Sequence, residues 1–494
     1  MRQDVYAKLS VTLIIVVAII RFTFALSYTI SGDACWHLST SRFIATQNKI
    51  PLFEGLGRLE PFWAPPAFHF FAAFLYKISN LISSEIADAS MKLVSPIFGT
   101  LTVVIVYLIT RKLFDARTAF YSMLFLNFVP LFLDYSVLSY VDSTAAFFSI
   151  LSAYLMINNR YFLSSASFGV ALLSKYNAIF MLPMLLYLVY AQSSDKRKRF
   201  TKMLTVVFLP LLVSSIWFIR NLVLLGNPFW PFLNGIFHGI RVGTYFGTFN
   251  FSNIFSFSPY LSSYLELFGV PNGNASLIFF YDIPLIKYLL AIWIAGTLIF
   301  LYPLARGFSR KSKDKNKLFL MSIYILFLSF LLMLFIYLVN VGWFGARLLL
   351  PTMPFIGILW ARGMDSIKLN NVYTIIVLVI GLGFIVAEVS KIAIAAKEWD
   401  VYGKDFEWAI SNSEKKDVFY GNGQCLSYNI NRVVIDHTAP FETEGINYVW
   451  ANNKWRIDFP MNEESFKKVN HSDKLIQVYN NSNTGTTIYK VRQE

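Results

Sequence analysis

The sequence predicts an all-α polytopic membrane protein with about eleven transmembrane helices and a small α/β domain at its C-terminus. The composition is 56% hydrophobic and 15% charged, whereas soluble domains carry about 25% charged residues. The mean hydropathy is +0.52. The apolar residues also form long blocks, and about 20 residues in a helix cross a hydrocarbon core of ~30 Å. Charged residues become frequent only near the C-terminus.

Short basic segments between the apolar blocks indicate how the helices are threaded. Arg2 and Lys8 place the N-terminus in the cytoplasm, because Lys and Arg are enriched in cytoplasmic loops. An odd number of crossings then places the C-terminal region outside. The expected helices are 9–30, 91–112, 118–133, 136–157, 161–174, 178–191, 200–224, 283–305, 318–340, 346–361 and 371–391.

Two long outer loops, 31–90 and 225–282, separate these helices. In the first loop, residues 34–47 and 66–78 are apolar on one side and too short to span, so we expect two helices lying in the membrane interface. The transmembrane domain accordingly covers 1–396, and both outer loops belong to it.

Residues 397–494 form the expected extracytoplasmic α/β domain. Short runs of β-branched and aromatic residues predict strands at 418–420, 433–435 and 448–450. A polar turn between 475–479 and 486–491 predicts a hairpin, and residues 402–412 suit a helix.

Charge and motifs exclude several classes. The formal net charge is +14, but the cations lie in loops such as 196–199 and 310–317, which indicates topology and no nucleic-acid partner. Two cysteines, Cys35 and Cys425, are too few for a disulfide framework or a Cys-rich zinc module. No phosphate-binding P-loop, HExxH or GxGxxG motif is present.

Three cations lie where positive charge is normally depleted. Lys175, Arg220 and Arg347 fall at the outer ends of predicted helices. Each alone is explained by a long side chain that reaches the membrane surface. Together at one level, they suit an anion such as a lipid phosphate, and we expect them to converge on one outward-facing cavity.

Acidic residues gather at the same level. Asp33 directly follows the first helix, Glu60 lies later in the loop, and Asp142 lies near a helix start. Asp33 suits either an N-cap or a catalytic base, and the residue pattern leaves both open. His37 lies one turn beyond Asp33, and His69 follows in the same loop. Their spacing supports no compact metal site, so no metal is expected.

Ordered motifs then point to a family. The segment from Ser31 to Leu38 resembles the first outer loop of polyprenol-dependent GT-C glycosyltransferases, which include protein O-mannosyltransferases and aminoarabinose transferases. The sequence departs at Ala34, where many members carry a second acid. Further similar segments are Trp63–His69, Tyr140–Ser143, Leu172–Tyr176, Arg220–Pro228 and Ala346–Pro351. The W-W-D-x-G signature of oligosaccharyltransferases is absent, which argues against that branch.

The resemblance implies a membrane enzyme that needs no cofactor. It would move a sugar from a polyprenyl-phosphate donor to a hydroxyl of a lipid, glycan or protein acceptor, with inversion, on the non-cytoplasmic face. Asp33 would act as base, and the three cations would bind the donor phosphate. Asp142, Glu60, His37 and His69 would orient sugar or acceptor. Two other classes stay open, a lipid or sugar transporter and a non-catalytic scaffold.

Overall fold

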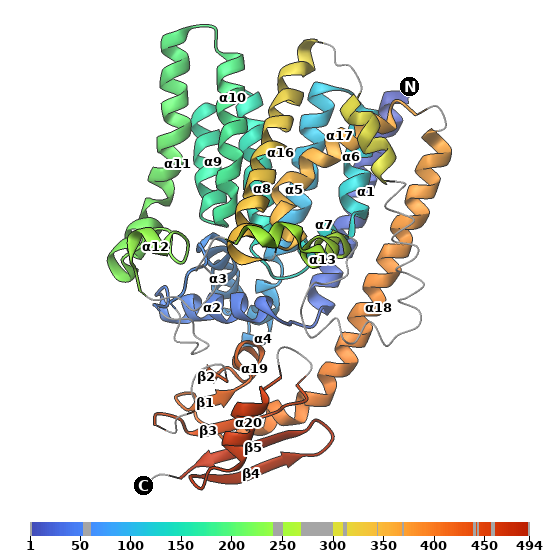
Figure 1. Cartoon of the computed structure of the whole chain (residues 1–494). Coiled ribbons are helices and arrows are strands. Elements are labelled where there is room, and N and C mark those ends of the chain that lie inside the picture. Colours follow the sequence, from blue (N-terminus) through green and yellow to red (C-terminus); the bar gives the residue numbers. More distant parts are fainter. Residues whose placement is uncertain are drawn as a thin grey trace.

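The structure is a computed structural model of the 494-residue chain. It describes residues 2–52, 61–240, 250–267, 300–309, 314–342, 344–367, 370–437, 441, 444–455 and 460–492. A helical bundle forms most of the molecule, and a small sheet lies beyond one end of it (Figure 1). We call this end of the bundle the domain-facing end.

Most helices of the bundle run roughly along one direction (Figure 1). Five described helices are long and apolar enough to cross a membrane, within 4–27, 84–113, 196–225, 316–340 and 372–411. The predicted helix 283–305 lies largely outside the described residues, although 300–309 are helical. The bundle helices are α1 (Arg2–Ser27), α5 (Val94–Leu113), α6 (Ala116–Phe128), α8 (Asp142–Ile157), α9 (Tyr161–Leu172), α10 (Leu182–Gln192), α11 (Lys196–Leu225), α16 (Asp314–Val341), α17 (Met353–Met364) and α18 (Asn370–Ser411). The chain is therefore a multi-pass membrane protein, as predicted.

Short apolar helices form the centre of the bundle. α8 packs against α5 and α9, α9 against α11, and α6 against α17. Their facing side chains build the largest buried apolar cluster, which contains Phe125, Trp360 and Ile358. Short 3-10 turns lead into two of these helices: η1 (Tyr176–Met181) precedes α10, and η4 (Ala346–Thr352) precedes α17. These turns place polar side chains at the domain-facing end.

The predicted boundaries at 133 and 136 are wrong. α6 ends at Phe128, α7 covers Pro130–Tyr135, and α8 begins only at Asp142. Val129 is extended, with φ −78° and ψ 117°. A proline disfavours helical backbone in the residue before it and lacks an N–H, so the helix breaks at Val129–Pro130. The break leaves a non-helical stretch, 136–141, directly before Asp142.

The first outer loop folds into three helices across the domain-facing end: α2 (Asp33–Gln47), α3 (Ala67–Ser79) and α4 (Ser84–Met91). The two predicted loop helices are therefore present. α2 packs against α3 on one side and against α19 (Gly423–Ile430) of the C-terminal domain on another. One buried apolar cluster runs from α2 and α3 into that domain.

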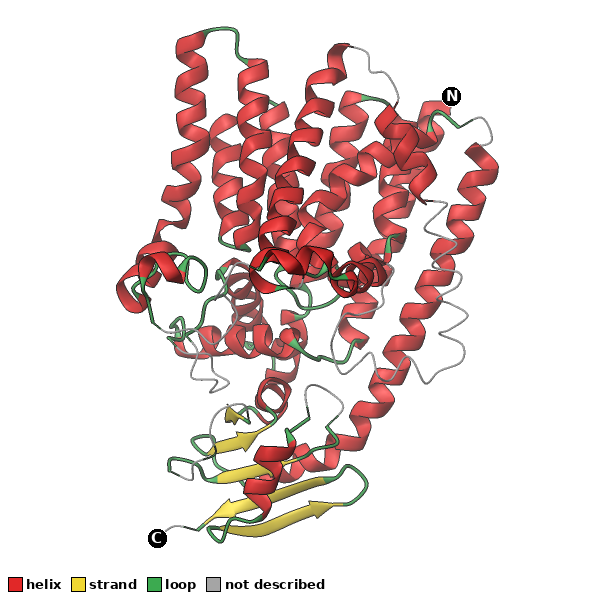
Figure 2. Cartoon of the chain, in the orientation of Figure 1, coloured by secondary structure: helices red, strands yellow, loops and turns green. Residues whose placement is uncertain are grey.

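The C-terminal domain is built on one five-stranded sheet, the strands of which are yellow in Figure 2. The strands are β1 (Val418–Gly421), β2 (Val433–Asp436), β3 (Tyr448–Ala451), β4 (Leu475–Asn481) and β5 (Thr486–Val491). Their order is β2-β1-β3-β5-β4, with β1 parallel to both neighbours and the β4–β5 hairpin antiparallel. The predicted strands are thus present. Helix α20 (Glu463–Asn470) was not predicted.

α18 joins the bundle to this domain without a break. It runs for 42 residues, from Asn370 to Ser411, across the predicted domain boundary at 397. The composition changes where the helix leaves the apolar layer. The helix itself continues because residues 393–411 include many Ala, Lys and Glu, which favour helix, and no Pro. The predicted helix 402–412 is the end of α18.

Candidate active site

A cavity of about 550 Å³ opens at the domain-facing end, a size within the range of sites for small molecules. Its polar wall combines α2, the start of α8, the α9–η1 connection and η4. The polar wall includes Asp33, His37, Asp142, Lys175 and Arg347. Its remaining wall is mostly apolar and includes Phe180, Leu211, Phe218, Phe229, Phe232, Met333 and Ile336.

Asp33 and Arg347 meet on this wall from distant parts of the chain. Arg347 Nη1 donates a hydrogen bond to Asp33 Oδ2 at 2.8 Å. The side chains are 39% and 28% exposed, so both reach the cavity. Asp33 is the first residue of α2, and the N-cap is Gly32, which makes no side-chain cap. The Asp33 carboxylate therefore lies at the positive end of α2 beside a guanidinium, and both favour negative charge there.

Lys175 and Asp142 form the second ion pair of the cavity. Lys175 Nζ donates to Asp142 Oδ1. Asp142 is 1% exposed, whereas the Lys175 side chain is 18% exposed toward the cavity. Asp142 is the first residue of α8 and Lys175 precedes η1, so the breaks in two short helices bring the pair together. A buried carboxylate needs such a partner, because unpaired charge is costly in an apolar bundle.

Arg220 does not line the cavity with the other two cations. Its guanidinium donates to the backbone oxygens of Phe62 and Pro51, at 3.0 and 2.8 Å, and it stacks over Trp217. The expected convergence of three cations is therefore wrong in this structure. The physical reason is that the carbonyls of Pro51 and Phe62 accept hydrogen bonds from Arg220, which ties the first outer loop to α11.

The two predicted histidines form a buried pair behind the polar wall. His37 lines the cavity, and its Nδ1 lies 3.0 Å from His69 Nε2. Burial lowers the pKa of His37 to about 4. Burial, and then the neighbouring His37, lower the pKa of His69 well below its usual value. Both rings are therefore neutral at neutral pH, and one donates to the other. His69 does not line the cavity, but its ring contacts those of His37 and Trp36, which do.

Glu266, from α13 (Phe257–Leu267) in the second outer loop, is a neighbour of the site that the sequence motifs did not predict. Its carboxylate accepts the backbone N–H of Ala346 and, at 2.9 Å, the hydroxyl of Tyr135. Burial raises its pKa, and the charge of Arg347 opposes this shift. Glu266 thus holds the turn that carries Arg347. It is the only acidic residue in 196–281, which was a signal that could have been used.

Two residues that line the cavity, Trp36 and Asn177, each carry a buried polar atom without a hydrogen-bond partner in the described part of the chain. These atoms are the indole N–H of Trp36 and the amide oxygen of Asn177, and buried polar atoms are usually paired. Glu60, the last predicted site residue, lies outside the described residues. Within those residues, no group of three or more metal-ligating side chains occurs.

Comparison with known proteins agrees with this architecture. Residues 64–218 match the family model of dolichyl-phosphate-mannose-protein mannosyltransferases. No curated protein matches the chain. The structure of ArnT from Cupriavidus metallidurans bound to undecaprenyl phosphate is similar with a TM-score of 0.65 and 14% identity, over 97% of each chain.

Two other solved structures share the fold. The oligosaccharyltransferase from Archaeoglobus fulgidus gives a TM-score of 0.54 at 14% identity, over 98% of this chain and 74% of that one. The arabinofuranosyltransferase AftD from Mycobacteria gives 0.52 at 11% identity, over 97% of this chain and 40% of that one. The chain therefore has the fold of these solved membrane glycosyltransferases, as the sequence motifs predicted, and the family model matches part of its bundle.

Proposed function

We propose that this protein transfers a sugar from a polyprenyl-phosphate donor to a hydroxyl acceptor, with inversion at the sugar carbon. The observation that carries the proposal is the pairing of Asp33 with Arg347 and of Asp142 with Lys175 on one cavity wall. The wall thus holds a carboxylate that can take a proton beside cations that can hold an anion. The ArnT structure with undecaprenyl phosphate supports the donor class.

In this reaction Asp33 accepts the proton of the acceptor hydroxyl while the acceptor oxygen bonds to the anomeric carbon. The bond between that carbon and the phosphate oxygen breaks, and its electron pair remains on the polyprenyl phosphate. Lys175 and Arg347 stabilise this developing charge. Both retain N–H groups beyond those used for Asp142 and Asp33, since an ammonium has three donors and a guanidinium five.

The remaining cavity residues suit orientation and lipid binding. Trp36, Asn177 and the neutral ring of His37 line the cavity and can orient the sugar or the acceptor there. The aromatic and aliphatic wall suits the first isoprene units of the donor. We expect no resident metal ion, so turnover should survive prolonged treatment with a chelator.

We further propose that the domain-facing end lies outside the cytoplasm. Cys35 and Cys425 form a disulfide there, and disulfides persist in oxidising compartments. The N-terminus lies at the opposite end of the bundle (Figure 1), and Arg2 and Lys8 favour the cytoplasm. A reporter active only outside the cytoplasm, fused after Glu494, should be active, whereas activity of a cytoplasmic reporter there would reverse the topology.

The test of the function begins with lipids that co-purify with the protein. Mass spectrometry should detect a polyprenyl phosphate or its glycosylated form. The purified protein is then given undecaprenyl-phosphate-linked hexoses and pentoses, with water as the hydroxyl acceptor, and release of undecaprenyl phosphate and free sugar is measured. Binding without release from any donor, together with movement of lipid across liposomes, would favour the transporter class instead.

A further inference from the structure

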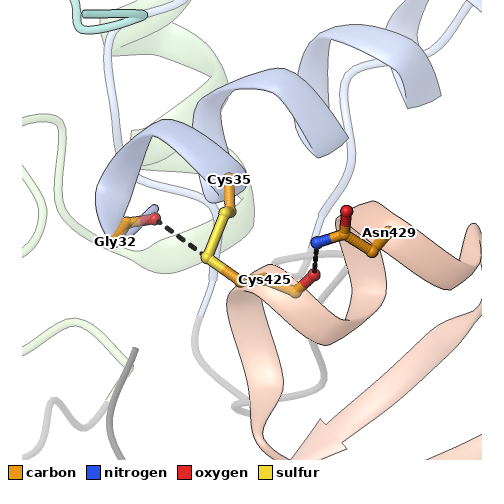
Figure 3. The surroundings of a disulfide bond; sticks show 4 residues. All are labelled: Gly32, Cys35, Cys425 and Asn429. Carbon is orange, nitrogen blue, oxygen red and sulfur yellow. Dashed lines mark hydrogen bonds between the residues drawn. A yellow bond between two sulfur atoms is a disulfide. The ribbon is translucent and has the colours of Figure 1, made fainter. Parts of the chain in front are cut away.

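The C-terminal domain is bonded covalently to the helix that carries Asp33. Cys35 of α2 and Cys425 of α19 form a disulfide across 390 residues of sequence (Figure 3). Both cysteines are fully buried. The Sγ atom of Cys425 lies 3.9 Å from the carbonyl oxygen of Gly32, so the bond packs against the turn directly before Asp33.

The first turns of α2 have two distinct sides. Asp33, Trp36 and His37 line the cavity, whereas Cys35 joins the domain. Successive helical residues are rotated by about 100°, so Cys35 points about 200° away from Asp33. The disulfide therefore fixes the first turn of α2 on the side opposite to the cavity. Gly32 directly precedes this turn, and its φ of +56° bends the chain sharply where α2 begins.

A second, non-covalent contact joins the same two helices farther along α2. Arg42 Nη1 donates to the carbonyl of Tyr428 at 3.0 Å, and Arg42 Nε pairs with Asp88 at 2.9 Å. Arg42 lies more than two turns beyond Asp33 and does not line the cavity. Of these two contacts between α2 and α19, only the disulfide adjoins the turn that carries Asp33.

We propose that Cys35 and Cys425 are positioning residues for Asp33, so that turnover depends on the oxidised disulfide while donor binding does not. This inference rests on the proposed function. A base must be held near the proton it removes, and a misplacement of about 1 Å can cost roughly a hundredfold in rate. Lys175 and Arg347 are carried by other elements, so the lipid phosphate loses no ligand when the bond is broken.

The experiment compares oxidised and reduced full-length protein in detergent. Dithiothreitol reduces the disulfide to two thiols and becomes a cyclic disulfide, and thiol labelling with mass analysis verifies this. We expect release of undecaprenyl phosphate from its glycosylated form to fall roughly tenfold to a hundredfold. The affinity for undecaprenyl phosphate itself should be unchanged, and reoxidation should restore turnover. Verified reduction with unchanged turnover would overturn the proposal.

Variants separate positioning from general docking. The double variant Cys35→Ala with Cys425→Ala should turn over as slowly as the reduced wild type, with or without reductant. It lacks the disulfide altogether, so it gives the expected result even if reductant does not fully reduce the buried bond. The matched control is Arg42→Gln, which weakens the same helix contact and leaves the disulfide intact. It should turn over nearly as the wild type does. An equal loss in Arg42→Gln would make domain docking, and not the disulfide, the cause.

A readout without catalysis keeps the two proposals apart. Amide hydrogen exchange of residues 30–38 should accelerate in the reduced protein, while exchange in α8 stays constant. If the wild type releases no undecaprenyl phosphate from any donor, the proposed function fails, and faster exchange at 30–38 still supports anchoring. Unchanged exchange in that segment would overturn the anchoring itself.

Discussion

The two sides of α2 are chemically opposite. On the cavity side, Asp33 is partly exposed and pairs with an arginine that is itself partly exposed. On the domain side, Cys35 is fully buried and covalently bonded. One short helix therefore has a partly exposed polar side and a buried side that is bonded to the C-terminal domain. Two residues on one helix can therefore differ completely in their surroundings. The Asp33 carboxylate can still meet a bound molecule, whereas the Cys35 sulfur is already bonded to Cys425.

The two arginines of the predicted cation cluster make the same distinction. Arg347 donates to a carboxylate on the cavity wall, whereas Arg220 donates to backbone carbonyls of the outer loop. Both lie at the ends of apolar helices, and the sequence pattern treats them alike. Their different partners predict different consequences when each is changed.

The largest effect is expected from Asp33→Asn. If Asp33 is the base, turnover should fall by at least about a hundredfold, because a positioned base contributes about 10²–10⁴-fold. Folding should persist, since the side-chain shape is kept and Asp33 is not the N-cap. The assay is release of undecaprenyl phosphate from its glycosylated form, with affinity for undecaprenyl phosphate as the control. Near-normal turnover would exclude Asp33 and move the search to Glu60.

The next largest effect is expected from Lys175→Gln. Loss of one charge-assisted hydrogen bond, worth about 1.5–3 kcal/mol, should weaken binding of undecaprenyl phosphate roughly tenfold to a hundredfold. The single variant also leaves Asp142 buried without its lysine. The double variant Lys175→Gln with Asp142→Asn removes that charge, so it should regain thermal stability but not lipid affinity. Recovery of affinity in the double variant would remove Lys175 from the phosphate site.

Much of the bundle and part of the site could be predicted from sequence. Apolar blocks of 20 residues identify long helices directly, and Asp33 could be selected because it directly follows the first of them. Helix breaks were harder, although Pro130 carried the signal for one. The true length of α18 was missed because a change in composition was taken as the end of a helix.

Other features depend on contacts that no local pattern contains. The Cys35–Cys425 bond joins residues 390 positions apart, and its two helices contribute to one apolar cluster. The role of Arg220 depends on carbonyl oxygens of a distant loop, and every residue has a carbonyl, so no side-chain motif marks them. Glu266 could be noticed in the sequence as an isolated acidic residue. Its partner could not, because the group that donates to it is the backbone N–H of Ala346, which no side-chain pattern marks.

A smaller effect is expected from Arg220→Gln. The change removes hydrogen bonds to Phe62 and Pro51 and should lower stability by about 1–3 kcal/mol, because buried carbonyls lose a charged donor. Affinity for undecaprenyl phosphate should stay near that of the wild type, unlike in Lys175→Gln. Thermal unfolding in detergent and lipid binding are measured on the same sample. A loss of affinity as large as that of Lys175→Gln would return Arg220 to the phosphate site.

The smallest effect at neutral pH is expected from the buried histidines, which should matter only in acid. The pKa of His37 is about 4 in the folded protein, against 6.5 for the free side chain. Between these two pH values His37 is protonated in the unfolded chain and neutral in the folded protein, so stability rises with pH through this window. The contribution of His37 to the free energy of unfolding is fully present above about pH 6.5. It falls by up to about 3 kcal/mol as the pH drops to 4. His69, the pKa of which is also lowered, acts in the same direction.

The thermal unfolding midpoint in detergent should therefore be flat from pH 8 to 7 and decline below about 6.5. His37→Gln cannot take up a proton, so its decline should be shallower. Equal declines in wild type and variant would assign the acid sensitivity to other groups and leave the His37–His69 pair without a charged form in this range.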